Sequence, residues 1–203
     1  MLQYQTINPK TLELLKNLQK INIFQDLRLV GGTGLALQIG HRRSIDLDLF
    51  GTLSADKICI HTELKKFGNL IILNQTKNIH QLTINNIKID IVNYPYPWLH
   101  NPLEIDNIKL AHIEDIAAMK LSAITSRGTK KDFIDIHFLL KKFSLTDLLN
   151  FYTKKYTDSS RFLVLKSLVY FEDAEDEPLP EMLEKVNWDA VKYDIKRHLK
   201  NNE

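Results

Sequence analysis

The sequence changes its hydrophobic period once, between residues 98 and 113, and this change constrains the fold more than any other feature. Before it, apolar and polar residues alternate, as in 80–84 and 87–92, which is typical of strands with one buried face. After it, apolar residues recur three and four positions apart, which is typical of helices. Strands followed by helices predict an α+β fold, in which a small mixed β-sheet core with flanking helices precedes a C-terminal helical half. We place the boundary so that 1–110 is the α/β core and 111–203 is the helical domain.

The composition narrows the class of protein further. With 203 residues, 44% of them apolar, the chain can bury a sizeable core, which excludes wholesale disorder. The net charge of only +2 argues against a protein that coats nucleic acid by bulk charge, although 1–143 holds 18 basic and 13 acidic side chains. A single cysteine, Cys59, excludes an internal disulfide and a thiolate metal cluster. Because the chain has no signal-peptide pattern and no apolar run of membrane-spanning length, we expect a soluble, cytoplasmic protein that does not contact a membrane.

The coarse order of elements follows from the same periods. Asn8 can cap a first helix that has Pro9 at its first position, and Asn85-Asn86 can form the two-residue turn of a hairpin. We expect strands at 27–30, 44–50, 70–73, 80–84 and 87–92, with 70–73 buried and with Ile45, Leu47 and Leu49 on one face of their strand. We expect helices at 11–20, 33–39, 57–67, 113–127, 131–143, 145–155, 161–171 and 181–200, and a loop at 94–98.

A glycine turn and a pair of carboxylates form the most informative stretch. Gly31 and Gly32 stand between a predicted strand and a predicted helix, where backbone N–H groups can approach an anion and the helix dipole favours phosphate. Asp46 and Asp48 are two residues apart on a predicted strand, so they point to the same face about 7 Å apart. Because like charges repel, such a pair favours a bound cation. A phosphate-binding turn beside paired carboxylates predicts metal-assisted phosphoryl chemistry.

A third acid would complete a metal site. Asp90 interrupts a strand whose isoleucines occupy the other face, which is unexpected unless something binds it. Oxygen ligands suit Mg²⁺, or Mn²⁺, and two ions held by Asp46, Asp48 and Asp90 would activate an acceptor hydroxyl and stabilise a leaving pyrophosphate.

These motifs resemble a known family. The glycine turn, the run Gly40-His-Arg-Arg-Ser-Ile-Asp-Leu-Asp-Leu-Phe50 and the later Lys120-Leu-Ser-Ala, Arg127-Gly and Lys131-Asp-Phe-Ile-Asp135 are similar to the AbiEii/AbiGii nucleotidyltransferase toxins. That family belongs to the polymerase-beta-type nucleotidyltransferase superfamily. The similarity is specific over 25–140 and looser over the rest. It implies that 1–110 is the nucleotidyltransferase core and that 111–203 completes the active site.

The resemblance also implies roles for individual residues. Gly31, Gly32 and Thr33 match the turn that holds the triphosphate, Ser44 and Asp46 match a Ser-x-Asp motif, and Asp46 and Asp48 match the metal-binding pair. Lys120 matches a lysine that contacts the nucleotide phosphates, and Asp135 matches a later catalytic aspartate. Asp90 is our assignment of the third superfamily acid. Three further cations are expected to bind the nucleotide: Arg42, Arg127 and Lys131. One departure is Gly34, where the family pattern would have alanine.

The implied activity is a Mg²⁺-dependent transfer of a nucleoside monophosphate from an NTP to an acceptor hydroxyl. The family's setting implies the toxin of a toxin–antitoxin or abortive-infection system for phage defence, with an antitoxin encoded nearby and RNA, such as the 3′ end of tRNA, as acceptor. Two alternatives stay open. One is a nucleotidyltransferase that acts on a small molecule or a protein side chain, and the other is a non-catalytic module that binds a nucleotide or a partner.

Each motif also has an ordinary structural explanation. Lys131 and Asp135 could form a helical pair four residues apart, worth about 0.3–0.5 kcal/mol, and Asp90 could lie on an exposed edge strand. We expect His41 to be a positioning or surface residue rather than a metal ligand, and the acidic stretch 172–177 to be a solvated loop between helices. The structural explanations require five independent coincidences in this order along the chain, whereas a single function explains all of the motifs together.

Overall fold

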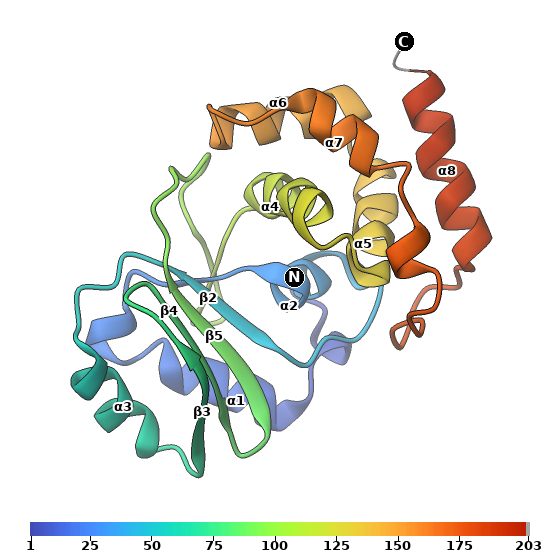
Figure 1. Cartoon of the computed structure of the whole chain (residues 1–203). Coiled ribbons are helices and arrows are strands. Elements are labelled where there is room, and N and C mark those ends of the chain that lie inside the picture. Colours follow the sequence, from blue (N-terminus) through green and yellow to red (C-terminus); the bar gives the residue numbers. More distant parts are fainter. Residues whose placement is uncertain (202–203) are drawn as a thin grey trace. The chain divides into compact units, whose positions relative to one another are not determined.

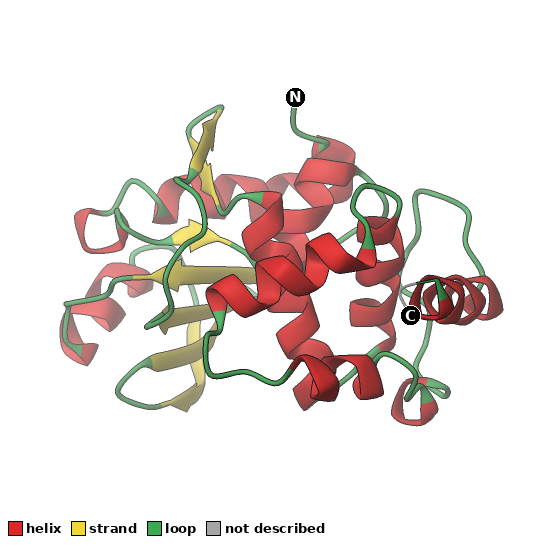
Figure 2. Ribbon diagram, turned by 90° about the horizontal axis from the view of Figure 1, so that it is seen from above, coloured by secondary structure: helices red, strands yellow, loops and turns green. Residues whose placement is uncertain are grey.

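The computed structural model describes residues 1–201, and the chain forms two compact units. The first consists of 1–95 and 101–111, and the second consists of 96–100 and the chain from 112 onward. Figure 2 shows the strands gathered in the first unit, whereas the second is built of helices and loops. The α+β fold with a mixed sheet, predicted from the change of hydrophobic period, is confirmed.

The first unit contains, within the described residues, one seven-stranded sheet in the order β3-β4-β5-β2-β1-β7-β6. β2 pairs with β5 in parallel, as β1 does with β7, and the other neighbours are antiparallel, so the sheet is mixed. Its strands are β1 (Arg28–Leu29), β2 (Leu47–Gly51), β3 (Leu70–Gln75), β4 (Ile79–Ile84), β5 (Ile87–Asn93), β6 (Leu103–Ile105) and β7 (Ile108–Leu110).

Alternation along β2 and β5 separates the core from the polar face of the sheet. Leu47, Leu49, Ile89 and Ile91 are fully buried in one hydrophobic cluster together with residues of α1 (Pro9–Leu18) and α3 (Lys57–Lys65). Figure 1 shows these two helices along β3, β4 and β5. The residues that alternate with these buried leucines and isoleucines along β2 and β5 therefore face the other side of the sheet, because successive side chains of a strand alternate.

Local signals explain where the first helices begin and end. The Asn8 side chain accepts a hydrogen bond from the Lys10 amide, and Pro9 occupies the first helical position of α1, as predicted. Helix α2 (Gly31–Ile39) ends at Gly40, whose positive φ of 78° is the left-handed conformation that closes many helices. Two 3₁₀ turns complete this set: η1 (Tyr4–Thr6) and η2 (Asn22–Phe24).

The second unit is helical. Its elements are α4 (Ile113–Ser126), α5 (Lys130–Leu140), α6 (Leu145–Lys155), α7 (Arg161–Ser167), η3 (Glu172–Ala174) and α8 (Trp188–Lys200). Helix α5 is buried along almost its whole length, including the predicted core residues Phe133, Ile134 and Ile136. Helix α6 begins with a reciprocal capping box between Ser144 and Asp147. No helix among residues 1–201 is both long enough and apolar enough to cross a bilayer.

The predicted hairpin is confirmed. Asn85 and Asn86 join β4 to β5 with φ values of 50° and 67°, the left-handed conformation that a tight hairpin turn requires. A second hairpin, β6–β7, was not predicted, although Asp106 and Asn107 form the same kind of turn with φ values of 53° and 62°. Its strands have three residues each, too short to show an alternating pattern.

Three other expectations are wrong. The predicted buried strand 70–73 is β3, which lies at the edge of the sheet with Ile71, Ile72 and Leu73 exposed. The strand predicted over 44–50 begins only at Leu47, and Ile45 is 66% exposed. The last helix begins at Trp188, where the Asn187 side chain caps it, rather than at 181.

Candidate active site

The glycine turn holds an aspartate against the start of α2. Gly31 is the first residue of the helix and has a φ of +63°, which side chains rarely adopt. A β-carbon at this position would collide with the Asp48 carboxylate, so the backbone and the acid are in close approach. The Asp48 carbonyl also accepts a hydrogen bond from the Val30 amide, at 2.9 Å. Only glycine allows both the conformation and the approach.

Asp48 and Asp90 are direct neighbours across the parallel pair β2–β5, where they occupy the same register position. Both lie on the face opposite the apolar cluster and are half-buried. Asp90 Oδ2 accepts a hydrogen bond from Gln81 Nε2 at 3.1 Å, and Lys88 Nζ lies 3.6 Å from the same oxygen. Asp90 Oδ1 is buried and has no hydrogen-bond partner among the described residues.

A buried oxygen without a hydrogen-bond partner lowers the stability of the fold, because it has lost its hydrogen bonds to water and gained none in their place. Two carboxylates side by side also repel each other. A divalent cation would satisfy the orphaned oxygen and offset the repulsion, and an all-oxygen donor set suits Mg²⁺ or Mn²⁺. The residues therefore fit the ion that the sequence predicted.

Asp46 lies directly before β2 rather than within it, which corrects the expectation that Asp46 and Asp48 share one strand. The Thr33 hydroxyl explains the difference. It donates to the Asp46 carbonyl and lies 2.8 Å from Ser44 Oγ. The segment before β2 therefore forms hydrogen bonds with Thr33 of α2 and does not extend the pairing of the sheet. Thr33 and Ser44 thus fix the backbone that carries the first aspartate.

Arg42 lies beside the second glycine. A β-carbon at Gly32 would collide with the Arg42 guanidinium and approach Ser44 Oγ at 3.2 Å. The Arg42 side chain is nearly fully buried and donates to the Arg43 carbonyl at 3.1 Å. A fixed cation and the first N–H groups of α2, which have no partners within the helix, therefore lie together. His41, expected to be a positioning or surface residue, is fully buried.

An open cavity of about 740 Å³ adjoins Asp46 within the first unit. Its lining includes two lysines, Lys10 and Lys88, and several amide side chains from α1 and from the β4–β5 turn. This volume is within the range of small-molecule sites.

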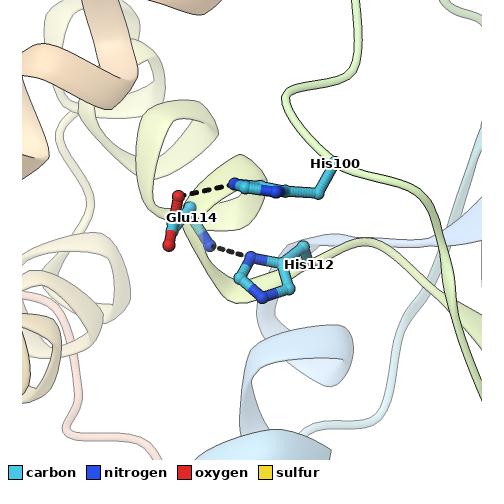
Figure 3. A group of neighbouring side chains, drawn as sticks. All are labelled: His100, His112 and Glu114. Carbon is cyan, nitrogen blue, oxygen red and sulfur yellow. Dashed lines mark hydrogen bonds and ion pairs between the residues drawn. The ribbon is translucent and has the colours of Figure 1, made fainter.

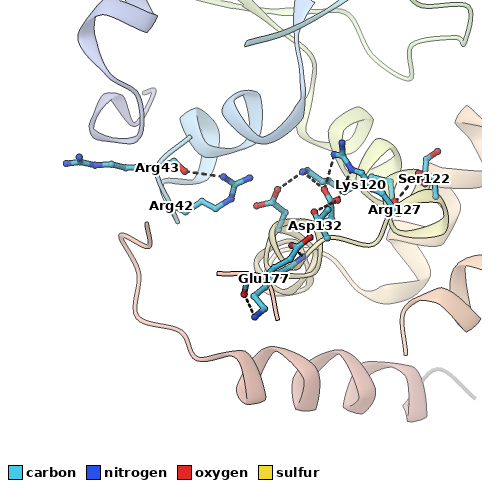
Figure 4. A network of polar contacts seen from close by, with 12 residues as sticks. Arg42, Arg43, Lys120, Ser122, Arg127, Asp132 and Glu177 are labelled. Atoms are coloured by element: carbon cyan, nitrogen blue, oxygen red, sulfur yellow. Dashed lines mark hydrogen bonds and ion pairs between the residues drawn. The ribbon is translucent and has the colours of Figure 1, made fainter. Parts of the chain in front are cut away.

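The second unit holds a buried ion-pair network on α4 and α5, shown in Figure 4. Lys120 Nζ lies 2.9 Å from Asp132 Oδ1 and 2.6 Å from Asp135 Oδ2, and all three side chains are nearly inaccessible to water. Arg127 Nε lies 3.1 Å from Asp132 Oδ2 and is itself 64% exposed. Lys120 and Asp135, predicted to bind phosphate and to act in catalysis, are thus bonded to each other. Their catalytic roles stay predictions.

The charges around Asp132 set its acidity. Burial raises its pKa, but the Lys120 ammonium and then the Arg127 guanidinium outweigh burial and hold the pKa below the ordinary value of 3.8. The Thr129 hydroxyl adds a hydrogen bond to Asp132 at 2.7 Å. Asp132 therefore stays ionised at neutral pH.

The remaining cations of this region differ in exposure. Lys131 is exposed at the start of α5, so its predicted contact with the nucleotide stays a prediction. Lys130, which is buried, donates through Nζ to the carbonyls of Glu175 and Glu177, while its amide donates to the Glu177 carboxylate at 2.7 Å. The acidic stretch 172–177, expected to be a solvated loop, therefore contacts α5 (Figure 4).

One buried ion pair gave no signal in the sequence. Lys155 Nζ lies 2.7 Å from Asp115 Oδ1, and both side chains are fully buried. Lys155 also donates to the Pro97 carbonyl at 2.8 Å, and Asp115 accepts from the amides of Leu99 and His100. The pair anchors 96–100 to α4 and α6. Its 40-residue separation explains why periodicity could not reveal it.

The sequence matches the family described as nucleotidyl transferase AbiEii toxin, type IV TA system, over residues 13–201. The chain belongs to this family. It is therefore a nucleotidyltransferase, which takes an NTP as substrate. A relative from Aquifex aeolicus (strain VF5), an uncharacterized protein, is 36% identical over 194 residues, or 93% of each chain.

Solved structures share the fold of this AbiEii family member. JHP933 from Helicobacter pylori has a TM-score of 0.58 at 20% identity, covering 96% of this chain and 92% of the other. MenT4, a nucleotidyltransferase toxin from Mycobacterium tuberculosis H37Rv, has a TM-score of 0.58 at 15% identity, covering 92% and 79%. At these identities the likeness is one of fold.

Proposed function

We propose that this chain transfers a nucleoside monophosphate from an NTP to a hydroxyl of RNA, with Mg²⁺ or Mn²⁺ held by Asp46, Asp48 and Asp90. The proposal rests chiefly on the parallel register that pairs Asp48 with Asp90 while Asp90 Oδ1 lacks a partner among residues 1–201. When bound, the divalent ion supplies Lewis-acid chemistry, neutralising phosphate charge and favouring deprotonation of the acceptor hydroxyl.

The chain's own residues bind and orient the donor. The N–H groups of Gly31, Gly32 and Thr33 at the start of α2 bind the triphosphate, since a helix N-terminus favours anions. Arg42 beside Gly32 adds a fixed positive charge. Thr33 and Ser44 hold the backbone of Asp46, so the carboxylates keep their orientation during the reaction.

In the proposed step the acceptor oxygen forms a bond to the α-phosphorus, and the bond from that phosphorus to the bridging oxygen of the pyrophosphate breaks. The leaving pyrophosphate keeps the electron pair, and the hydroxyl proton passes to solvent or to a carboxylate. Positioning and charge stabilisation account for the rate, and no covalent enzyme intermediate is required. Lys120, Arg127, Lys131 and Asp135 are further proposed contributors.

RNA is the acceptor class that we favour, with the 3′ end of tRNA as the first candidate. Lys10 and Lys88, which line the cavity beside Asp46, are suited to a polyanionic acceptor. The family's description as a toxin of type IV TA systems supports a toxin role and an antitoxin partner. We further propose that the antitoxin is encoded nearby and that the protein acts in the cytoplasm in phage defence.

The test is to incubate the purified chain with each α-labelled NTP, Mg²⁺ and total RNA. We expect label in a ribonuclease-sensitive product, and no label with Asp46→Ala. Label that survives ribonuclease would exclude RNA and favour a small molecule or a protein acceptor. NTP binding without pyrophosphate release for any acceptor would overturn catalysis. Rescue of cell growth by the neighbouring gene product tests the antitoxin.

A further inference from the structure

Three side chains of types that can bind a metal ion meet at the start of α4, within the second unit. His100 Nε2 lies 2.6 Å from Glu114 Oε2, and the rings of His100 and His112 are 4.3 Å apart between centroids. One potential ligand atom from each of the three residues lies within 4.8 Å of the others. Figure 3 shows His100 approaching from its loop while His112 and Glu114 belong to the beginning of α4.

We propose that His100, His112 and Glu114 form a Zn²⁺ site. A four-coordinate zinc with ligands about 2.1 Å away separates those ligands by roughly 3.4 Å, so small side-chain rotations would complete the site. Two imidazoles and one carboxylate leave a fourth position for water. Mg²⁺ prefers oxygen ligands throughout and does not fit this set.

The backbone around the cluster is already fixed. Asp115, one residue after Glu114, accepts hydrogen bonds from the amides of Leu99 and His100 at 2.9 and 3.2 Å, and its partner Lys155 is fully buried. His100 is therefore held beside α4 with or without a metal ion. Pre-organisation of this kind lowers the entropy lost when a ligand binds.

Zinc would take the place of the direct contact between His100 Nε2 and Glu114 Oε2 and would bind both atoms. His112 Nδ1 accepts the Glu114 amide at 3.4 Å, which is long for a hydrogen bond. The positive end of the helix dipole opposes a cation, but the Glu114 carboxylate in the first turn supplies the opposite charge. The His100 and Glu114 side chains are 43% and 25% exposed, so an ion can reach them from solvent.

The two histidines of the cluster come from segments that are separate in the chain. His100 ends the short segment 96–100, and His112 is the first residue after the chain returns to the second unit. A metal ion bound to both would cross-link these two segments through side chains. It should therefore stabilise the folded second unit by mass action.

The experiment is calorimetric titration of Zn²⁺ into the full chain carrying Cys59→Ser, which removes the exposed thiol, with Mg²⁺ in excess. The ligand variants are His100→Ala, Glu114→Gln and His112→Asn, the last chosen because asparagine also caps helices. The control is His198→Ala, since His198 is a histidine near a carboxylate, Asp194, outside the cluster.

We expect one Zn²⁺ per chain and at least about 10-fold weaker binding in each ligand variant, the loss that even an outer-shell substitution causes. The His198→Ala chain should bind normally, and Zn²⁺ should raise the thermal midpoint only where binding is retained. Co²⁺ should give a visible absorption band that Zn²⁺ abolishes. Equal binding by all variants, or binding lost in Asp48→Asn instead, would overturn the site; both results are independent of nucleotidyl transfer.

Discussion

Acidic side chains have different surroundings in the two units of this protein. In the first unit, Asp48 and Asp90 are half-buried neighbours, and one Asp90 oxygen has no partner among the described residues. In the second unit, Asp132 and Asp135 are almost fully buried, and both bind Lys120. In the first arrangement two carboxylates are adjacent and Lys88 Nζ lies 3.6 Å from one of them, whereas in the second a buried ammonium contacts both carboxylates.

This difference in the surroundings of the acidic side chains suggests which substitutions will test function and which will test stability. Breaking a buried ion pair destabilises the fold, because removing one partner leaves the other charge uncompensated. Two carboxylates side by side at a polar sheet face repel each other, and such an arrangement is typical of binding sites. Substitutions at Asp48 and Asp90 should therefore affect transfer more than stability, whereas substitutions in the Lys120 network should affect stability whatever they do to transfer.

The largest expected effect is that of Lys120→Met. It leaves Asp132 and Asp135 buried without their shared ammonium, so we expect the free energy of unfolding to fall by about 3–5 kcal/mol. Chemical denaturation measures it, with Lys142→Met, at an exposed lysine, as the control. A loss below about 1 kcal/mol, the range of surface pairs, would contradict the comparison.

The second is Asp48→Asn, which should reduce nucleotidyl transfer on the order of 10²–10³-fold, as the loss of one transition-state contact does. Its free energy of unfolding should not fall, because the substitution removes the repulsion between Asp48 and Asp90. The transfer assay and denaturation are run together, with Asp158→Asn, at an exposed aspartate, as the control. A variant that unfolds easily but transfers normally would reverse the roles of the two units.

The third is Gly31→Ala, which should lower both stability and transfer. The positive φ costs about 1–2 kcal/mol for a residue with a side chain, and the new methyl group would displace the Asp48 carboxylate. Gly128→Ala is a matched control, because Gly128 has a φ of +52° but a β-carbon there meets no atom closer than 3.4 Å. If both variants transfer equally well, close approach to Asp48 does not matter.

The smallest effect concerns pH. Because the folded pKa of Asp132 is below 3.8, its ionised form stabilises the fold fully above that value and loses this contribution as pH falls through the lowered pKa. Unfolding free energies of the wild type and Asp132→Asn should therefore converge below pH 3.8. A constant difference from neutral pH to strong acid would show that Asp132 does not titrate as expected.

The sequence predicted what depends on local patterns. The hairpin turn at Asn85-Asn86, the cap at Asn8 and the α+β order all follow from residues close together in the chain. The pairing of β2 with β5, which brings Asp48 to Asp90, depends on contacts between distant segments, so periodicity could suggest the third acid but not its register. The burial of 70–73 failed for the same reason, since an apolar run does not reveal whether a strand is central or at an edge.

The edge strand β3 has a practical consequence for handling the protein. Its outer side faces away from β4, and Ile71, Ile72 and Leu73 are each about half exposed or more. An apolar edge of this kind can recruit a strand from another molecule, so it should limit the concentration at which the purified chain stays dissolved. A lysine in place of Ile72 should raise that concentration and leave the fold intact.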